Sequence, residues 1–99
     1  MTVYIIAQLS FTQREAYERY QARFFEVFRR FEGRLLAADE RPLVLEGSWE
    51  REKLVLISFA DESAARRFME DAEYREISKD RKAGADAVVL LVRGLPPTG

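Results

Sequence analysis

The sequence predicts an α+β domain in which four antiparallel strands form one sheet and helices cover one of its faces. Three observations predict this class. Short runs rich in branched and aromatic residues occur four times, and the segments between them include two with apolar residues at three- and four-residue spacing. The resulting order is strand, helix, strand, strand, helix, strand, which is a known way of packing helices against one face of an antiparallel sheet.

The first strand is expected at residues 3–9, where VYIIAQL precedes a polar cluster. A long helix should follow and end near Gly33. Thr12 and Glu15 have the spacing of a capping box, and Gly33 stands where helices often end in a left-handed residue. One stripe of this helix is apolar and consists of Tyr17, Tyr20, Phe24, Val27, Phe28 and Phe31.

The second strand is expected at residues 34–40 and should stop at Pro42, because proline has no N–H for a strand ladder. Residues 43–46 and 53–59 are interpreted as the two ends of a third strand that is interrupted around residues 47–52.

The second helix is expected to begin at Asp61, which is a suitable N-cap, and to gain a further helical turn in residues 73–82. Residues 86–93 complete the sheet as the fourth strand. The prediction is therefore a single ferredoxin-like domain, βαββαβ, over residues 1–95, with a C-terminal tail at 96–99.

The composition excludes several classes of function. The 99 residues contain 16 Lys and Arg against 17 Asp and Glu, so there is no net basic charge to favour nucleic acid or an anionic membrane. Cysteine and histidine are absent, which removes the usual zinc and haem ligands and the commonest general base. We expect a cytoplasmic protein with no cofactor, no metal, no nucleic-acid partner and no membrane partner.

Three of the four expected strands are apolar on both faces, although helices on one side can cover only one. Leaving about ten aliphatic side chains exposed would cost on the order of ten kcal/mol, so something should cover the second face. A second copy of the sheet is the simplest cover, since twofold dimers are the commonest soluble oligomers. We therefore expect a homodimer, sheet to sheet, that shields residues such as Ile6, Ile57 and Leu91.

The only tryptophan, Trp49, lies in a polar turn beside the third strand. Two interpretations are open. Trp49 reaches over the rim of the dimer contact or the partner's strand edge, or it forms a local lid on a helix of its own subunit.

Several segments together resemble the domain-of-unknown-function 1330 family: YIIAQLSFTQREAYERY, FEGRLLA, VLEGSW, LVLISFAD, EYREI and Arg81. The resemblance spans residues 3–93 and implies a dimeric α/β barrel, in which two ferredoxin-like units pack sheet to sheet. The family often has a Gly-Gly pair where this chain has Glu32-Gly33. It supplies no activity, and related cofactor-independent monooxygenases, small isomerases and muconolactone- or chlorite-handling enzymes are analogies of fold.

Four charged residues at strand ends are candidate ligand contacts: Arg34, Asp39, Glu46 and Arg81. An arginine could bind a carboxylate in a bidentate pair, and Glu46 could serve as a base. The plainer interpretation is structural, with Arg81 paired to Glu46 or Asp86 and Glu46 a satisfied hydrogen-bond acceptor.

Aromatic residues supply the other candidates, Tyr17, Tyr20, Trp49 and Tyr74. The tyrosines could wall an apolar ligand pocket between helix and sheet, although such a stripe is more often plain core. The leading hypothesis is a homodimer that binds a small anionic or aromatic metabolite in a helix-sheet cleft. The alternatives are a cofactor-independent monooxygenase- or isomerase-like enzyme, with Glu46 or Asp39 as base and Trp49 or Tyr74 as pocket wall, and a structural or regulatory dimer without ligand.

Overall fold

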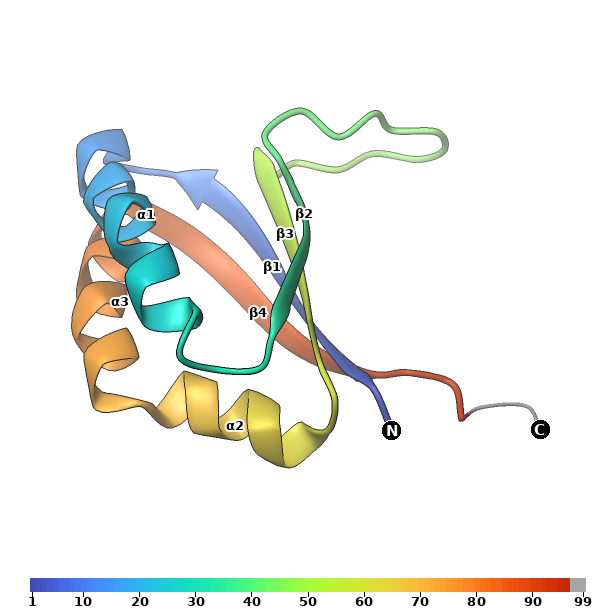
Figure 1. The fold of residues 1–99 in the computed structure, drawn as a ribbon. Helices are drawn as coiled ribbons and strands as arrows, with labels where there is room; N and C mark the ends of the chain where they lie inside the picture. Colours follow the sequence, from blue (N-terminus) through green and yellow to red (C-terminus); the bar gives the residue numbers. More distant parts are fainter. Residues whose placement is uncertain (97–99) are drawn as a thin grey trace.

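The fold is seen in a computed structural model, which describes residues 1–96. Figure 1 shows a sheet on one side and a layer of helices on the other. The elements are β1 (Val3–Phe11), α1 (Arg14–Phe28), β2 (Arg34–Asp39), β3 (Lys53–Phe59), α2 (Glu62–Glu70), α3 (Ala72–Gly84) and β4 (Ala85–Arg93).

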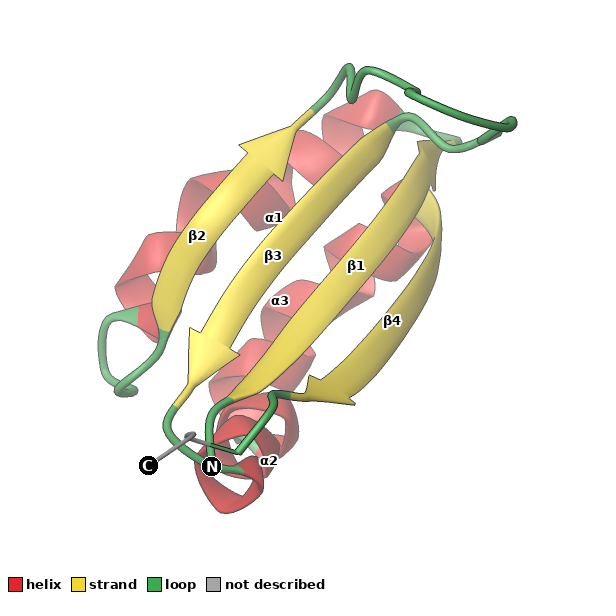
Figure 2. Ribbon diagram, turned by 90° about the vertical axis from the view of Figure 1, so that its right-hand side faces the viewer, coloured by secondary structure: helices red, strands yellow, loops and turns green. Residues whose placement is uncertain are grey.

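The four strands form one sheet in the order β2-β3-β1-β4, and every neighbouring pair is antiparallel. All the helices lie on the same face of this sheet, as Figure 2 shows from the opposite side. The predicted ferredoxin-like arrangement is therefore confirmed, with one helix more than expected.

Helix α1 begins and ends differently from the prediction. Gln13 is its N-cap and makes no side-chain cap hydrogen bond, while the Thr12 hydroxyl donates to the backbone oxygen of Ala83 at 3.4 Å. The predicted capping box is wrong, because the end of α3 lies beside Thr12. Gly33 does not have the predicted left-handed conformation either, since Gly47 is the one described residue with positive φ.

Gly33 is instead required for close packing. A Cβ at this position would lie 2.7 Å from the Phe59 ring and 2.8 Å from the Phe28 ring. Real Cβ atoms do not approach carbon atoms so closely, so a larger residue would push the aromatic core apart.

Residues 40–52 form a long connection without strand structure, and the expected strand at 43–46 is wrong. Leu43 and Leu45 are 84% and 86% exposed, so this apolar run is not part of the sheet. The connection, which we call the arm, projects beyond the sheet on the side away from the helices (Figure 1). Gly47, at φ 80°, supplies the left-handed residue of its turn.

The second helical region consists of two helices that meet at Asp71. Asp61 caps α2 as predicted, accepting from Ala64 N at 2.8 Å. Asp71 then caps α3 by accepting from Tyr74 N at 2.9 Å. The predicted further turn is thus a helix of 13 residues with a cap of its own.

The core lies between the helices and the face of the sheet that carries Val3, Ile5 and Leu9. Phe68 of α2 is at its centre, with its ring centroid within 6.1 Å of five other aromatic rings, namely Phe24, Phe28, Phe31, Phe59 and Tyr74. Ile57 and Leu91 are level with Ile5 on this helix-covered face. Our assignment of these two residues to the second face is wrong, because strand alternation groups residues but does not say which group meets the helices.

The opposite face of the sheet, here called the outer face, is not covered by any helix of residues 1–96 (Figure 2). Ile6 lies at its centre, level with Leu56 on one side and Leu90 on the other. Val88, Leu90 and Val92 are between 40% and 44% exposed. The expectation of an uncovered apolar face is therefore confirmed for Ile6.

Candidate functional site

A cavity of about 230 Å³ lies between the helix layer and the middle of the sheet. The strands contribute apolar side chains from all four members of the sheet: Ile5, Ala7, Leu9, Leu35, Ala38, Val55, Ile57 and Val89. The helices contribute Tyr17, Tyr20, Phe24, Phe25, Phe68, Met69 and Tyr74. The aromatic stripe of α1 is thus both core and cavity wall, which joins the two interpretations made from the sequence.

The wall contains two cationic side chains, Lys53 and Arg81, and no carboxylate among the described residues. Arg81 is only 9% exposed. It forms no ion pair with any acidic residue in the described part of the chain. Its buried Nε atom has no hydrogen-bond partner there.

The expected ion pair of Arg81 with Glu46 or Asp86 is therefore wrong. Asp86 is contacted by Arg51, whose Nη1 donates to the Asp86 backbone oxygen at 2.9 Å. Arg81 lies at the last turn of α3 and turns toward α1, where its Cζ is 5.9 Å from the centre of the Tyr20 ring.

The tyrosines beside Arg81 are hydrogen-bonding groups. The hydroxyls of Tyr20 and Tyr74 are 2.9 Å apart, and either one can donate to the other. Burial raises the pKa of Tyr17 to about 12 and raises the pKa of Tyr20 well above 10. Because Tyr17 and Tyr20 keep their protons at neutral pH, neither of them supplies a negative charge for Arg81.

Lys53 is the functional candidate that the sequence analysis missed. It is 5% exposed, its Nζ donates to Gln21 Oε1 at 3.3 Å, and it lies 4.8 Å from the centre of the Tyr17 ring. Burial is the main cause that lowers the pKa of its ammonium group. The signal in the sequence is only partial: Lys53 shares the strand parity of Val55, Ile57 and Phe59, but this parity does not say that their face meets the helices.

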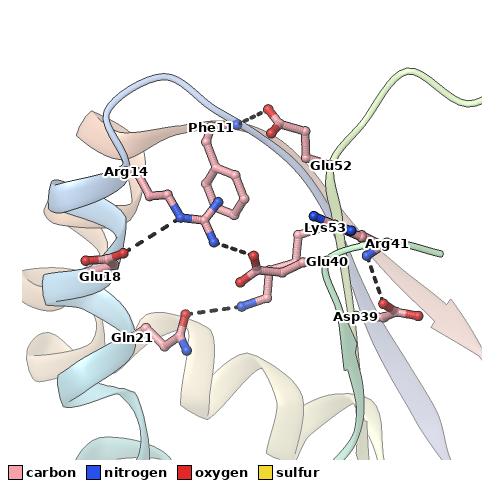
Figure 3. A network of polar contacts seen from close by, with 9 residues as sticks. All are labelled: Phe11, Arg14, Glu18, Gln21, Asp39, Glu40, Arg41, Glu52 and Lys53. Carbon is pink, nitrogen blue, oxygen red and sulfur yellow. Dashed lines mark hydrogen bonds and ion pairs between the residues drawn. The ribbon is translucent and has the colours of Figure 1, made fainter.

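A second polar group, drawn in Figure 3, lies near Gln21 and Lys53 of the cavity wall. The Arg14 guanidinium is paired with Glu40 at the end of β2 and is 3.7 Å from Glu18. The hydrogen bond from Arg14 lowers the pKa of Glu40. Both residues line a second hollow that shares Tyr17 and Gln21 with the main cavity.

Four of the residues predicted as ligand contacts line the cavity: Tyr17, Tyr20, Tyr74 and Arg81. The other four, Arg34, Asp39, Glu46 and Trp49, do not. Arg34, Asp39 and Glu46 are exposed, and Asp39 accepts from the backbone of Arg41. Trp49 donates from Nε1 to Gln8 Oε1 at 3.0 Å.

Gln8 belongs to the outer face, because it is level with Leu54 and Val88. Trp49 therefore lies at the outer face and not over a helix of its own subunit, so the local-lid interpretation is wrong.

No group of three or more acidic side chains in residues 1–96 is arranged to hold a metal ion. None of the helices in this part of the chain combines the length and apolarity needed to cross a membrane.

A family model matches nearly the whole sequence of this chain. The model of a family described as "Domain of unknown function (DUF1330)" matches residues 2–95. No curated protein matches the chain in sequence.

Solved structures share the fold at low sequence identity. A protein of unknown function from Rhodopseudomonas palustris is 21% identical, with a TM-score of 0.79 over 97% of this chain and 84% of that one. SnoaB, a cofactor-independent oxygenase from Streptomyces nogalater, is 15% identical, with a TM-score of 0.68 over 97% and 95%. A dabb family protein with a ferredoxin-like fold from Mesorhizobium loti is 10% identical, with a TM-score of 0.68 over 96% and 98%.

Proposed function

The chain belongs to the DUF1330 family, and we propose that it is a homodimer that binds a small anionic or aromatic metabolite in the cavity between its helices and its sheet. The cavity carries the ligand part of this proposal. Well-packed interiors have few voids larger than a water molecule, whereas this one measures about 230 Å³ and reaches from β2 to β4. Its apolar wall with a few polar groups is typical of small-molecule sites.

The proposed site is accessible from the edge of the sheet. Ala38 on the edge strand β2 is exposed and also lines the cavity. Core-facing Val89 is 37% exposed, so the wall is open to solvent at β4 as well. A ligand can therefore enter without any opening of the aromatic core.

A thermal-shift screen with aromatic carboxylates and neutral aromatic compounds tests the ligand part. A ligand at a hundred times its Kd adds about 2.7 kcal/mol to the free energy of unfolding, which for a domain of this size raises Tm by more than about 10 °C. Ala38→Trp should abolish the shift by filling the entrance. Ala72→Trp, on the exposed start of α3, should keep it, and an absence of any shift across both classes would contradict the proposal.

The dimer part is supported by the outer face and the arm. A second copy fits because the centre of the outer face has no charged side chain, so two such faces meet without burying an unpaired charge. The arm projects beyond the sheet on the side away from the helices (Figure 1), and its exposed Leu43 and Leu45 would extend the contact.

Sedimentation velocity tests the dimer. We expect a dimer at micromolar concentration and a monomer for Leu90→Asp, which places a charge at the proposed contact. Leu95→Asp is the matched control, because Leu95 is 94% exposed and lies outside the sheet. A wild-type chain that stays monomeric and soluble would contradict the proposed interface.

A cofactor-independent oxygenase-like reaction is the second candidate, favoured by the shared fold with SnoaB. Asp39 and Glu46 lie outside the cavity, which leaves Lys53 as the wall residue best suited to accept a proton, since burial lowers its pKa. If a substrate is found, Lys53→Met should lose turnover while Glu46→Gln keeps it. The third candidate, a structural or regulatory dimer without ligand, predicts no thermal shift with either class of compound.

A further inference from the structure

The cavity contains a positive charge that the described part of the protein does not compensate. Arg81 is more than nine-tenths buried and has neither a carboxylate partner nor a hydrogen bond at Nε. Arginine keeps its charge in proteins, and a buried charge without a partner is expensive. The neighbouring phenols cannot lower this cost by ionising, because burial raises the pKa of Tyr17 and Tyr20.

The groups around Arg81 are also hydrogen-bond donors. Tyr20 and Tyr74 share one hydrogen bond, so the pair has one O–H left to donate to a third group. Tyr17, Tyr20 and Tyr74 all line the same cavity as Arg81. This end of the cavity therefore presents a guanidinium and phenolic donors. No described residue lining the cavity supplies a negatively charged acceptor for them.

Resting on the proposed function, we propose that the ligand is an aromatic carboxylate whose carboxylate group binds Arg81 and the adjoining tyrosine hydroxyls, with its ring against the apolar wall. A planar guanidinium matches the two oxygens of a carboxylate, and charge-assisted hydrogen bonds of this kind are the strong ones. The ring has aromatic and aliphatic neighbours on both sides of the cavity, Phe24 and Phe68 from the helices and Val55 and Ile57 from the sheet.

The volume of the cavity limits the size of the aromatic carboxylate that it can hold. An apolar protein cavity of about 150 Å³ holds benzene, so about 230 Å³ accommodates a ligand of roughly nine or ten heavy atoms. A single ring with a carboxylate and one small substituent has this size, and a larger ring system would extend toward the entrance at Ala38.

Lys53 is the other cation, but its surroundings differ. Its ammonium group already contacts Gln21 and the face of Tyr17. Arg81 therefore has the greater need of an anionic partner, and the proposal assigns the carboxylate to Arg81.

Calorimetric titration with three probes tests the assignment. The probes are 4-methylbenzoate, the neutral isostere 4-methylbenzamide, and acetate, which carries the charge without the ring. We expect the benzoate to bind at least tenfold more tightly than the amide, and acetate to bind more weakly than both. Arg81→Met should weaken the benzoate tenfold to a hundredfold, the range of a charge-assisted hydrogen bond, and leave the amide nearly unchanged.

Arg75→Met is the matched control, because Arg75 is an exposed arginine on the same helix. It should bind all three probes like the wild type. Amide binding by Arg81→Met shows at the same time that this variant is folded.

The outcomes separate the two proposals. Equal binding of benzoate and amide, unchanged by Arg81→Met, would overturn the carboxylate assignment and leave a neutral-ligand cavity. A preference for benzoate that is lost in Lys53→Met and kept in Arg81→Met would also overturn it. Absence of binding by both aromatic probes and by the wider screen would overturn the proposed function together with this inference.

Discussion

Replacement of Arg81 by methionine should make the unliganded protein more stable. Methionine keeps most of the length of the side chain and removes a guanidinium that is 9% exposed and has an unsatisfied Nε. An unsatisfied buried polar group costs about 1–3 kcal/mol. The Cζ atom of Arg81 lies 5.9 Å from the centre of the Tyr20 ring, at the outer limit of a cation–π contact, so this contact offsets only about 0.5–1 kcal/mol of the cost.

The difference between the two ranges is about 0–2.5 kcal/mol, so we expect a gain of about 1 kcal/mol in the free energy of unfolding, or several degrees in Tm for a domain of this size. Calorimetry at one fixed protein concentration measures this gain, because Tm would depend on concentration if the protein forms the proposed dimer. Arg75→Met should change stability by less than about 0.5 kcal/mol. A loss of more than about 1 kcal/mol in Arg81→Met would show that Arg81 stabilises the fold, and the reasoning about an uncompensated charge would be refuted.

Three further predictions concern single interactions. Asp61→Ala removes the cap of α2 and should lower the free energy of unfolding, measured in urea, by about 1 kcal/mol. Asp61→Asn should retain most of the stability, because asparagine also caps helices. An equal loss of stability in both variants would argue against the cap. The unfolded phenols lose their protons near pH 10 while folded Tyr17 keeps its proton to about 12, so the folded state binds more protons and stability should fall between these values. Tyr17→Phe should reduce this fall, and an unchanged slope would contradict the assignment. Lys53 has the opposite effect just below pH 10.5, because its lowered pKa means that the unfolded chain binds more protons than the folded one, so stability should rise with pH there. Lys53→Met should remove this rise. An unchanged rise would count against burial of the ammonium group.

The strands and helices could be predicted where residue pattern and local chemistry agree. Asp61 is an example, since an aspartate before an apolar-periodic segment both caps and begins the helix. The capping box at Thr12 failed because a distant segment, the end of α3, occupies the space beside it. The strand expected at 43–46 failed because an apolar run does not reveal whether it pairs with a sheet or stays exposed, as Leu43 and Leu45 do.

The candidate site could be predicted only in part. Helical spacing predicts that Tyr17, Tyr20 and Tyr74 face the sheet, because this spacing fixes the face of the helix on which a side chain lies. The role of Arg81 depends on which carboxylates are near it. The packing of α3 against α1, two helices that are distant in the sequence, decides which groups surround Arg81. Strand parity groups Lys53 with Val55 and Ile57, but it does not say which group meets the helices, so parity alone could not place Lys53 in the cavity wall.

The most direct test of the central claim is to locate a bound probe by NMR, using intermolecular NOEs between 4-methylbenzoate and assigned methyl groups. The proposed site predicts NOEs to Ala7, Val55 and Ile57, which line the cavity. NOEs confined to Leu56 and Leu90 of the outer face, or an absence of NOEs at saturating probe, would contradict a ligand site between the helices and the sheet.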